Sequence, residues 1–406
     1  MITDLQENEA FSKILNNLAE TLDITEKQHQ DVVNRYQAVG DWLAQEDSLL
    51  SPYKPEITPQ GSFLIGTMIK AVNEGGELDI DAVCQLKGKQ ANWTQFDVKK
   101  IVGDRLKDHG TYKKMIDEEG RRCWTLHYAE SLRFHMDILP ALVAQGYDIL
   151  LEKSFSEREL ERANELLISI TDNTLPNYWT STDPSHWPSS NPFGYAIWFL
   201  EQASLEVRKS MEAVATVQPV PNYTKNKLPL QQAVQLLKRH RDIMFNGDEH
   251  RPISIIITTL AARAYQKETD VTMALLNIVA QMSTLVEERY VGGRIEKWIP
   301  NPVNPAENFA DKWAEYPQKE ENFYRWLTQV KHDVREAIDQ RGLHLIEKAM
   351  ERPFGQRAVT EAFSKMGNQA RQSRENGQQK MAAGTGILGS VGATVKNHNF
   401  YGKSEE

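Results

Sequence analysis

The sequence predicts a protein of the α+β class with two lobes, in which a mixed β-sheet forms one lobe and helices form the other. Alternating apolar and polar residues at 77–86, 122–128 and 132–142 indicate strands, and the last two segments are only three residues apart. Residues 228–281 and 320–349 instead carry apolar side chains at helical spacing. We therefore expect a sheet-bearing half followed by a helical half, with a cleft between them.

The N-terminal segment is predicted to be helical. Apolar residues recur at helical spacing between residues 4 and 46, and few helix-breaking residues occur before Ser51-Pro52. We predict one or two long amphipathic helices here and assign residues 1–50 to a helical brace that precedes the main domain.

The sheet-bearing half begins with a change of period. We expect, in order, a turn at Gly61-Ser62, a short helix at 67–72, a strand at 77–86, a polar helix at 92–109 and the two adjacent strands. Residues 156–170 return to helical spacing, and a connection rich in Pro, Trp and Ser follows as far as Pro192.

The helical half is interrupted near residues 246–252 and ends in a change of composition. Beyond Phe363 the chain is rich in Gly, Gln, Ser, Lys and Asn, which cannot bury enough apolar surface to order the segment. We predict that residues 366–406 form a flexible tail.

The composition excludes several classes of protein. The 406 residues suffice for two or three domains, and Cys84 and Cys123 lack metal-ligand spacing, so we expect reduced thiols in a cytoplasmic protein. No apolar run is long enough to span a membrane, and the N-terminus is acidic where a signal peptide would be basic. A net charge of −9 argues against duplex nucleic acid as a partner, although one local basic patch can still hold a phosphate.

Three aspartates fall on the predicted strands. Alternate residues of a strand share a face, so Asp79 and Asp81 project together while Ile80 points into the core. Asp137 shares a face of its strand with His135 and reaches the same place, although for His135 itself we favour ordinary packing. Three carboxylates suit Mg²⁺, which prefers oxygen ligands.

Such a cluster suits phosphoryl transfer. Two Mg²⁺ ions, or Mn²⁺ in their place, can stabilise the attacking oxygen and the leaving pyrophosphate. Asp79 and Asp81 would bind both ions, and Asp137 would bind the ion at the attacking hydroxyl and could accept its proton. Upstream, Gly61 lets the backbone approach a triphosphate, and Ser62 offers a hydroxyl and an N–H.

Each motif is weak when it stands alone. A single Asp-x-Asp on a strand is more often a solvated edge, and a single Gly-Ser pair means little. Carboxylates in apolar strands are unfavourable without partners, however, and here three of them follow one Gly-Ser turn. The combination therefore favours a metal site over a structural explanation.

Together these motifs resemble the DNA polymerase β-like nucleotidyltransferases, and within them the CD-NTases, the bacterial relatives of cyclic GMP-AMP synthase and the dinucleotide cyclases. The family signature is a Gly-Ser turn, a strand of alternating acidic and apolar residues, and a third acidic strand; Gly61-Ser62, residues 79–82 and Asp137 match it. The resemblance implies a two-lobed polymerase β-like fold, with residues 51–220 as the catalytic core and residues 221–365 as the helical lobe.

The resemblance extends into the helical half. In the family a helix Lys and a downstream Ser contact the donor triphosphate, and by position these are Lys238 and Ser254. Relatives often stack an aromatic side chain beside this Ser, whereas Ile255 follows it here. Residues 301–313 resemble another family element, in which Asn301 stands in place of the usual Asp.

The charge of residues 221–251 agrees with this placement. The segment has an excess of three positive charges in an otherwise acidic chain, as a triphosphate site requires. Taken singly, Lys225, Lys227 and Arg239 are better explained as a solvated helix face.

The resemblance implies a template-independent enzyme that joins nucleoside triphosphates, ATP among them, into a cyclic di- or trinucleotide with loss of pyrophosphate. In relatives the product is a second messenger that activates an effector in CBASS anti-phage defence, and some relatives have an accessory protein that acts on the C-terminal tail. Two alternatives stay open: transfer to a linear oligonucleotide, RNA or protein, and a catalytically silent nucleotide-binding protein. The acidic charge disfavours an RNA acceptor, and the three carboxylates disfavour a silent protein.

Overall fold

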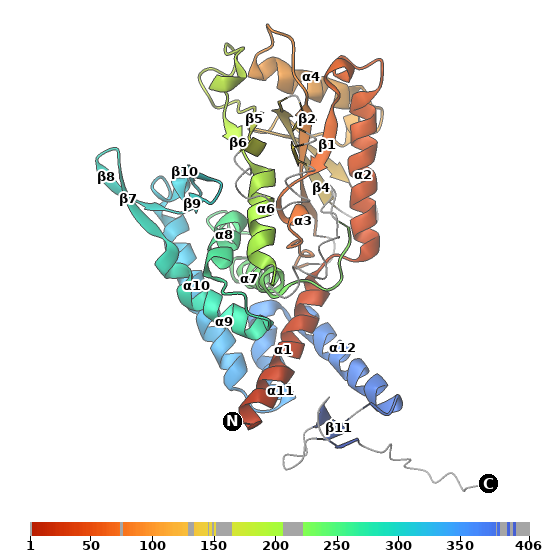
Figure 1. Cartoon of the computed structure of the whole chain (residues 1–406), viewed down its shortest axis with the longest axis vertical. Helices are drawn as coiled ribbons and strands as arrows, with labels where there is room; N and C mark the ends of the chain where they lie inside the picture. The colour runs from red at the N-terminus through yellow and green to blue at the C-terminus, as the bar shows by residue number, and fades with distance from the viewer. Residues whose placement is uncertain are drawn as a thin grey trace, which may run out of the picture.

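The two predicted lobes are stacked along the long axis of the chain in the computed structural model, with the sheet in the upper lobe and most helices in the lower one (Figure 1). The structure describes residues 2–73, 76–128, 134–144, 146–147, 150–151, 165–205, 222–378, 380–381, 388–389 and 393–394. The predicted combination of a mixed sheet and a helical lobe is confirmed.

A six-stranded mixed sheet lies at the centre of the upper lobe. Its strands are β1 (Glu56–Pro59), β2 (Leu78–Leu86), β3 (Trp124–Tyr128), β4 (Phe134–Leu142), β5 (Ile168–Ile170) and β6 (Ser189–Ser190). They lie in the order β1-β2-β4-β5-β6, and β3 pairs with β4. The pair β2 and β4 is parallel, whereas all other pairs are antiparallel. The two segments predicted to be adjacent strands are therefore neighbours.

The two faces of the sheet meet different layers. On one face Ile80 and Met136 belong to a buried cluster with α2 (Glu26–Ala44) and α4 (Gln95–Asp108). On the other face Val83 belongs to the larger core that the helical lobe shares. Alternate residues along β2 and β4 thus point either to the core of the sheet lobe or toward the helical lobe.

Helices make up the lower lobe. They are α1 (Ile2–Leu22), α6 (Pro192–Ala203), α7 (Pro229–Phe245), α8 (Ser254–Ala264), α9 (Val271–Gln281), α10 (Pro317–Asp339), α11 (Leu343–Phe354) and α12 (Gln356–Glu375). Helix α1 lies against α7, α9 and α12, whereas α2 lies against β1, so the predicted N-terminal brace contacts both lobes. The numerical boundaries between the lobes stay predictions.

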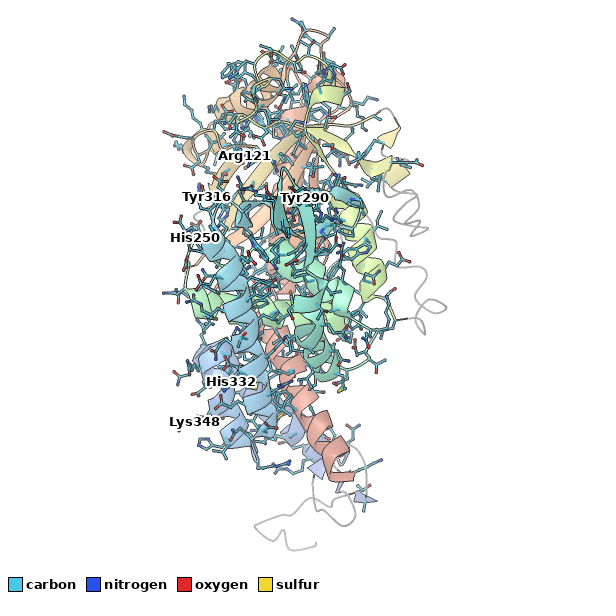
Figure 2. All side chains as sticks on the ribbon, turned by 90° about the vertical axis from the view of Figure 1, so that its left-hand side faces the viewer. Arg121, His250, Tyr290, Tyr316, His332 and Lys348 are labelled. Carbon is cyan, nitrogen blue, oxygen red and sulfur yellow. The ribbon has the colours of Figure 1, made fainter. Side chains whose placement is uncertain are left out.

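Two small hairpins stand beside the boundary of the lobes. They are β7 (Glu287–Val291) with β8 (Arg294–Trp298), and β9 (Pro300–Asn301) with β10 (Asn304–Asn308). Figure 2 shows Tyr290 of the first hairpin between Arg121 on the sheet lobe and His332 on α10. Single turns of 3-10 helix occur at Ser51–Tyr53, Tyr112–Lys114, Pro184–His186, Met282–Leu285 and Asp311–Trp313.

The predicted helix at residues 67–72 is wrong. A short helix instead begins at the Gly-Ser pair itself, as α3 (Gly61–Leu64), and residues 67–71 form a loop. The carbonyl groups of Thr67 and Met68 accept hydrogen bonds from side chains of α7, which replace the bonds that a helix would make.

Two further predictions need correction. The predicted helix over 156–170 ends in the strand β5, because Ile168 and Ile170 alternate with a polar residue and β5 pairs with β4; residues 152–164 lie outside the described residues. The tail predicted from residue 366 does not begin there, since α12 continues to Glu375 and packs on α1. Beyond it, short strands occur at Lys380–Met381, Leu388–Gly389 and Ala393–Thr394.

Within the described ranges, no helix combines the length and the apolar character that a membrane crossing needs.

Candidate active site

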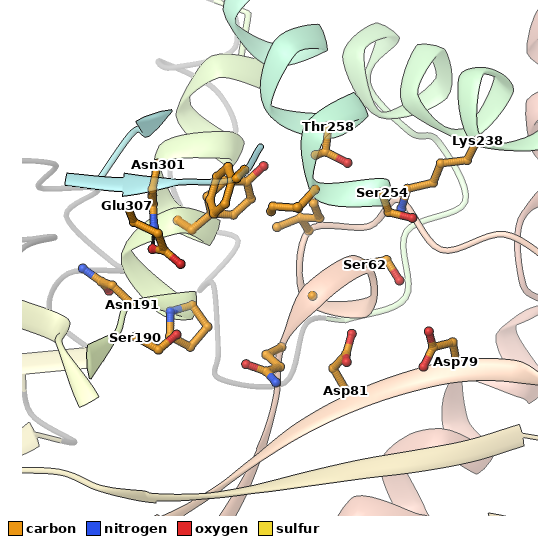
Figure 3. Close-up of a pocket in the computed structure, with 17 residues that line it drawn as sticks. Ser62, Asp79, Asp81, Ser190, Asn191, Lys238, Ser254, Thr258, Asn301 and Glu307 are labelled. Carbon is orange, nitrogen blue, oxygen red and sulfur yellow. Dashed lines mark hydrogen bonds between the residues drawn. The ribbon is translucent and has the colours of Figure 1, made fainter. Parts of the chain in front are cut away.

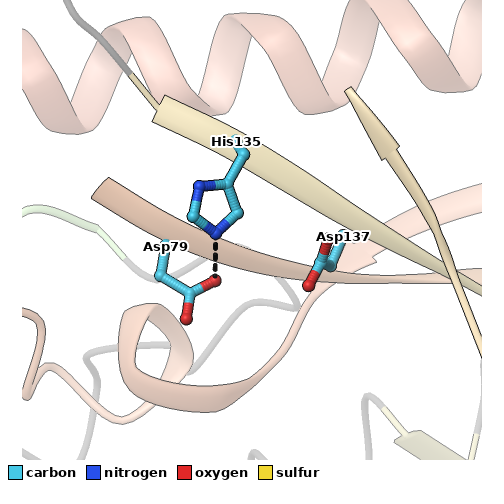
Figure 4. A group of neighbouring side chains, drawn as sticks. All are labelled: Asp79, His135 and Asp137. Carbon is cyan, nitrogen blue, oxygen red and sulfur yellow. Dashed lines mark ion pairs between the residues drawn. The ribbon is translucent and has the colours of Figure 1, made fainter. Parts of the chain in front are cut away.

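The predicted aspartates meet on the sheet face that is directed toward the helical lobe. Asp81 of β2 lies directly beside Asp137 of β4 in the parallel register, and Asp79 lies beside His135 (Figure 4). One ligand atom from each of Asp79, His135 and Asp137 lies within 4.8 Å of the others. The strand period and the pairing together bring these side chains to one place.

His135 enters this group, which corrects the preference for ordinary packing. Its Nε2 atom lies 3.1 Å from Asp79 Oδ1, and its Nδ1 atom lies 3.4 Å from Glu77 Oε2. The hydrogen bond to Asp79 raises the pKa of His135 to about 9. An imidazolium therefore partly neutralises the exposed carboxylate at neutral pH.

Asp81 carries the most perturbed carboxylate of the group. Burial, followed by the charges of Asp79 and Asp137, raises its pKa to about 7. Lys238 and His135 act in the opposite direction but do not offset this effect. The cluster is thus short of positive charge, which is the condition under which a bound cation stabilises buried carboxylates.

Contacts from neighbouring segments hold two of the aspartates in place. The backbone carbonyl of Asp81 accepts hydrogen bonds from Gln60 N at 2.9 Å and from Tyr36 Oη at 3.1 Å. Thr125 of β3 donates its hydroxyl to Asp137 Oδ1 at 2.5 Å. These bonds restrict the orientation of the side chains that the sequence singled out.

Gly61 is required at its position for a geometric reason. Its φ of 60° lies in the left-handed region, and a Cβ there would overlap the carboxylate of Asp81. Ser62 follows it in α3, and the carbonyl of Ser62 accepts a hydrogen bond from Thr67 N at 2.9 Å. The Gly-Ser pair therefore packs directly against the carboxylate cluster.

Four side chains of α7 hold the loop that follows α3. Gln231 donates to Ile65 O, Gln235 to Met68 O, Lys238 to Thr67 O and Arg239 to Lys70 O. Their spacing places them on one face of the helix. Arg239 is buried, so its explanation as part of a solvated helix face is wrong. Part of the local positive charge thus serves the structure of the loop.

The two residues assigned to the triphosphate both line the cleft. Burial, and then the charge of Arg241, lowers the pKa of Lys238 to about 7. Arg241 donates to Ser254 Oγ at 2.8 Å and to Pro252 O at 3.1 Å, which fixes the start of α8. Sequence reasoning assigned no role to Arg241, because its contact lies across a helix break.

A cleft of about 320 Å³ joins these elements. In Figure 3, Ser62, Asp79, Asp81, Lys238 and Ser254 lie toward one end. Asn191, Asn301 and Glu307 lie toward the other end. The lining also includes Gln60, Ile65, Ser190, Pro192, Tyr195, Ile255, Thr258 and Phe309. The sequence singled out Asn301 by resemblance without assigning it a role, and it did not predict Asn191 or Glu307 as site residues, because no local pattern places β10 beside α6.

The residues present fit a hard cation. Three carboxylates from two parallel strands offer oxygen ligands, and the raised pKa of Asp81 reflects charge that a cation would relieve. A second acidic group, His332, Asp333 and Glu336 on α10, is different in kind. There Asp333 already accepts hydrogen bonds from His240 and Gln329, so we assign no metal to it.

Comparison with known proteins gives matches over this region and over the whole chain. A family model described as cyclic GMP-AMP synthase DncV-like, nucleotidyltransferase domain, matches residues 55–140. The c-di-GMP synthase of Roseivirga ehrenbergii is 28% identical over 393 residues, which cover 96% of each chain. The cyclic dinucleotide synthase CdnG of Bradyrhizobium diazoefficiens is 23% identical over 90% of this chain and 86% of the relative.

Solved structures of similar proteins agree on the fold. The CD-NTase CdnG of Bradyrhizobium diazoefficiens in complex with GTP has a TM-score of 0.64 at 18% identity, covering 88% of this chain and 99% of that one. The CdnC:HORMA-deltaN complex of E. coli has a TM-score of 0.54 at 15% identity, covering 84% and 96%. Both likenesses concern the fold alone.

Proposed function

We propose that the chain, whose residues 55–140 match the DncV-like nucleotidyltransferase model, is a CD-NTase that joins nucleoside triphosphates into a cyclic dinucleotide with loss of pyrophosphate. One observation carries the proposal. Asp79 and Asp81 lie at one end of a cleft that Lys238 and Ser254 also line, and Asp137 is the register partner of Asp81 on the neighbouring strand. Phosphoryl transfer needs carboxylates on one side of a cleft and a positively charged side chain on the other.

GTP is the substrate that we propose. Two relatives that cover most of the chain are named c-di-GMP synthase and cyclic dinucleotide synthase CdnG, and CdnG was solved with GTP. These names support guanine and a ring of two nucleotides. The sequence suggested ATP among the substrates, whereas these names favour GTP. They also favour a cyclic dinucleotide over a cyclic trinucleotide.

Two Mg²⁺ ions are part of the proposal. Asp79, Asp81 and Asp137 would hold them, and the ions would supply positive charge to the reacting phosphate and to the pyrophosphate. The excess negative charge of the cluster supports this assignment.

The chain's own groups have separate roles in the proposed reaction. Lys238, Ser254 and the Gly61-Ser62 turn bind the triphosphate of the donor nucleotide. A ribose hydroxyl of the acceptor attacks the α-phosphorus, the bond to the β-phosphate breaks, and pyrophosphate leaves. The hydroxyl proton goes to Asp137, which Thr125 orients. A second transfer of the same kind closes the ring.

The biological setting belongs to the proposal as well. We place the enzyme in the cytoplasm, where its product would activate an effector in anti-phage defence of the CBASS type. CdnC was solved with a HORMA protein, which supports an accessory protein for this chain too. Residues 395–406, at the end of the predicted tail, lie outside the described residues.

One assay tests the function against its alternatives. Purified protein is incubated with labelled GTP, ATP, CTP and UTP and with Mg²⁺, and the products are treated with phosphatase and separated by thin-layer chromatography. We expect a phosphatase-resistant product that depends on GTP and disappears in Asp79→Ala and Asp81→Ala. Asp104→Ala, which changes an exposed carboxylate on α4, is the matched control.

The other outcomes separate the alternatives. Products that phosphatase degrades, or label on RNA or protein, indicate another acceptor. If the wild-type protein and the two variants are equally inactive with either Mg²⁺ or Mn²⁺ under every activating condition, the chain is a silent nucleotide-binding protein.

A further inference from the structure

The end of the cleft away from Asp79 and Asp81 has no role in the proposed phosphoryl transfer. Figure 3 places Asn191, Asn301 and Glu307 there, away from Lys238 and Asp79. The cleft lining also includes Tyr195, Ile255 and Phe309. Aromatic and apolar walls of this kind suit a planar base. A nucleotide with its phosphates at Lys238 would therefore direct its base toward the second end.

Glu307 is held at this end by a fixed partner. The side-chain amide of Asn301 donates to Glu307 Oε2 at 2.7 Å. The carbonyl oxygen of the same side chain accepts a hydrogen bond from Val303 N at 3.0 Å, and Asn301 is buried. The backbone contact fixes which way the amide points, so its NH₂ group always faces the carboxylate.

This contact gives a reason for an unusual residue. Asn301 stands where the resembled family usually has Asp. An Asp at this position would place a second carboxylate against Glu307, and the two like charges would repel each other. The amide of Asn301 instead donates a hydrogen bond to Oε2 of Glu307. The other carboxylate oxygen of Glu307, Oε1, has no hydrogen-bond partner within the described ranges.

We propose that Glu307 selects guanine as the base of the bound nucleotide, with Asn301 as its positioning residue; this inference rests on the proposed function. Guanine presents two adjacent donors, N1–H and the exocyclic N2 amine, and a carboxylate can accept both. Adenine presents a lone pair at N1, which a carboxylate repels. A site built to accept hydrogen bonds from one base discriminates strongly against a base that lacks the donors.

Inosine nucleotides separate the two hydrogen bonds. Hypoxanthine keeps N1–H but lacks the exocyclic N2 amine of guanine, so it can make only one of the two bonds to Glu307. The expected order of affinity is GTP, then ITP, then ATP.

The experiment measures binding without turnover. Isothermal titration with the α,β-methylene analogues of GTP, ITP and ATP, in Mg²⁺, gives a dissociation constant for each base. We expect the wild-type protein to bind the GTP analogue at least ten-fold more tightly than the ATP analogue, with ITP between them. Glu307→Gln replaces an acceptor oxygen by a donor and should remove at least ten-fold of this preference.

Two variants accompany Glu307→Gln. Glu288→Gln changes an exposed carboxylate of the β7–β8 hairpin that pairs with Lys297, and it should leave the preference unchanged. Asn301→Asp should lower the ratio of GTP to ATP affinity, a change that loss of folding alone would not produce because it would weaken both nucleotides equally.

The inference and the proposed function fail in different ways. Equal affinity of the wild-type protein for GTP and ATP, or a preference that survives Glu307→Gln, overturns the inference even if a cyclic product forms. A guanine preference that depends on Glu307 supports it, even if the protein forms no cyclic product, and in that case the proposed function is wrong.

Discussion

Asp81 receives contacts from two separate parts of the chain. Tyr36 of α2 and Gln60 before α3 bond to its backbone carbonyl, and Gly61 packs against its carboxylate. Burial, and then the charges of Asp79 and Asp137, accounts for the raised pKa of its carboxyl group. At the scale of the residue, the site depends on one carboxylate whose surroundings leave little room for change.

Gly61→Ala tests this packing directly. The left-handed φ of Gly61 costs an alanine about 1–2 kcal/mol, and the new Cβ would displace the Asp81 carboxylate. Because a displacement of about 1 Å can cost roughly 100-fold in rate, we expect nucleotide transfer to fall by about that factor. Initial rates of product formation measure the effect.

Gly110→Ala is the control, since a Cβ at Gly110 would meet nothing within 4 Å. Gly61→Ala with wild-type activity would mean that the position of Asp81 does not limit the reaction.

The sequence predicted the residues whose placement depends on a local pattern. The period of a strand places Asp79 and Asp81 on one face, and the same rule applies to Asp137. It could not predict the ion pair between His135 and Asp79, because that contact depends on the register between β2 and β4. Glu307 was missed for the same reason, since only the tertiary fold brings β10 to the cleft.

At the scale of the element, α7 supports the site by holding the loop that follows α3. Gln231, Gln235, Lys238 and Arg239 bond to consecutive parts of the loop over residues 65–71. The loop connects α3 to β2, and these two elements carry the Gly-Ser pair and two of the aspartates. The helix therefore holds part of the segment that lies between the Gly-Ser pair and the two aspartates of β2.

Gln235→Leu should loosen this loop. The substitution removes the bond to Met68 O and leaves that carbonyl without its partner, which costs about 1–3 kcal/mol. We expect faster amide hydrogen exchange in residues 65–71 together with a reduced rate of nucleotide transfer. Hydrogen-exchange mass spectrometry on the intact protein measures the first effect.

Gln232→Leu provides the comparison on the same helix. Gln232 makes no hydrogen bond to this loop in the part of the chain that the structure describes. Equal exchange in the two variants would show that the contacts of α7 do not order the loop.

Elements were predicted where apolar periodicity is strong and missed where it is weak. Helices α1, α2, α4 and α7 follow their patterns closely. The hairpin of β7 and β8 was missed, although Gly292 and Gly293 at its turn both have positive φ and a Gly-Gly pair between alternating residues is a hairpin signal. The loop at 67–71 could not be predicted, because side chains of α7 satisfy its backbone.

At the scale of the whole molecule, ionic contacts fix segments that lie far apart in the chain. Asp172 is almost fully buried and pairs with Arg121 and Arg122, which precede β3. Burial alone would raise the pKa of Asp172, but hydrogen bonds from Arg121, Thr174 and Arg122 hold it well below its usual range. The pair therefore ties the segment after β5 to the start of β3.

The stability of the protein should depend on this carboxylate at acid pH. A group whose pKa is lowered by folding stabilises the folded state above its unfolded pKa of about 3.9, and the contribution is lost as the pH falls below that value. We expect Asp172→Asn to lower the free energy of unfolding by about 3 kcal/mol at pH 7 and to flatten its decrease as the pH falls from about 4 to about 2. Thermal melts across this pH range provide the measurement.

Asp41→Asn, which changes an exposed carboxylate on α2, should leave the pH profile unchanged. An Asp172→Asn profile parallel to that of the wild-type protein would mean that the buried carboxylate does not govern the response to acid.

At this scale the central proposal is that the protein joins two nucleotides into a ring in the cleft between its two lobes. The most direct measurement is the intact mass of the product formed from GTP and Mg²⁺ by the purified chain. We expect a mass equal to two guanosine monophosphate units less two waters, with two pyrophosphates released per product and no product formed by Asp79→Ala. A linear product that keeps its 5′-triphosphate as the end point, or a ring formed equally well by Asp79→Ala, would contradict it.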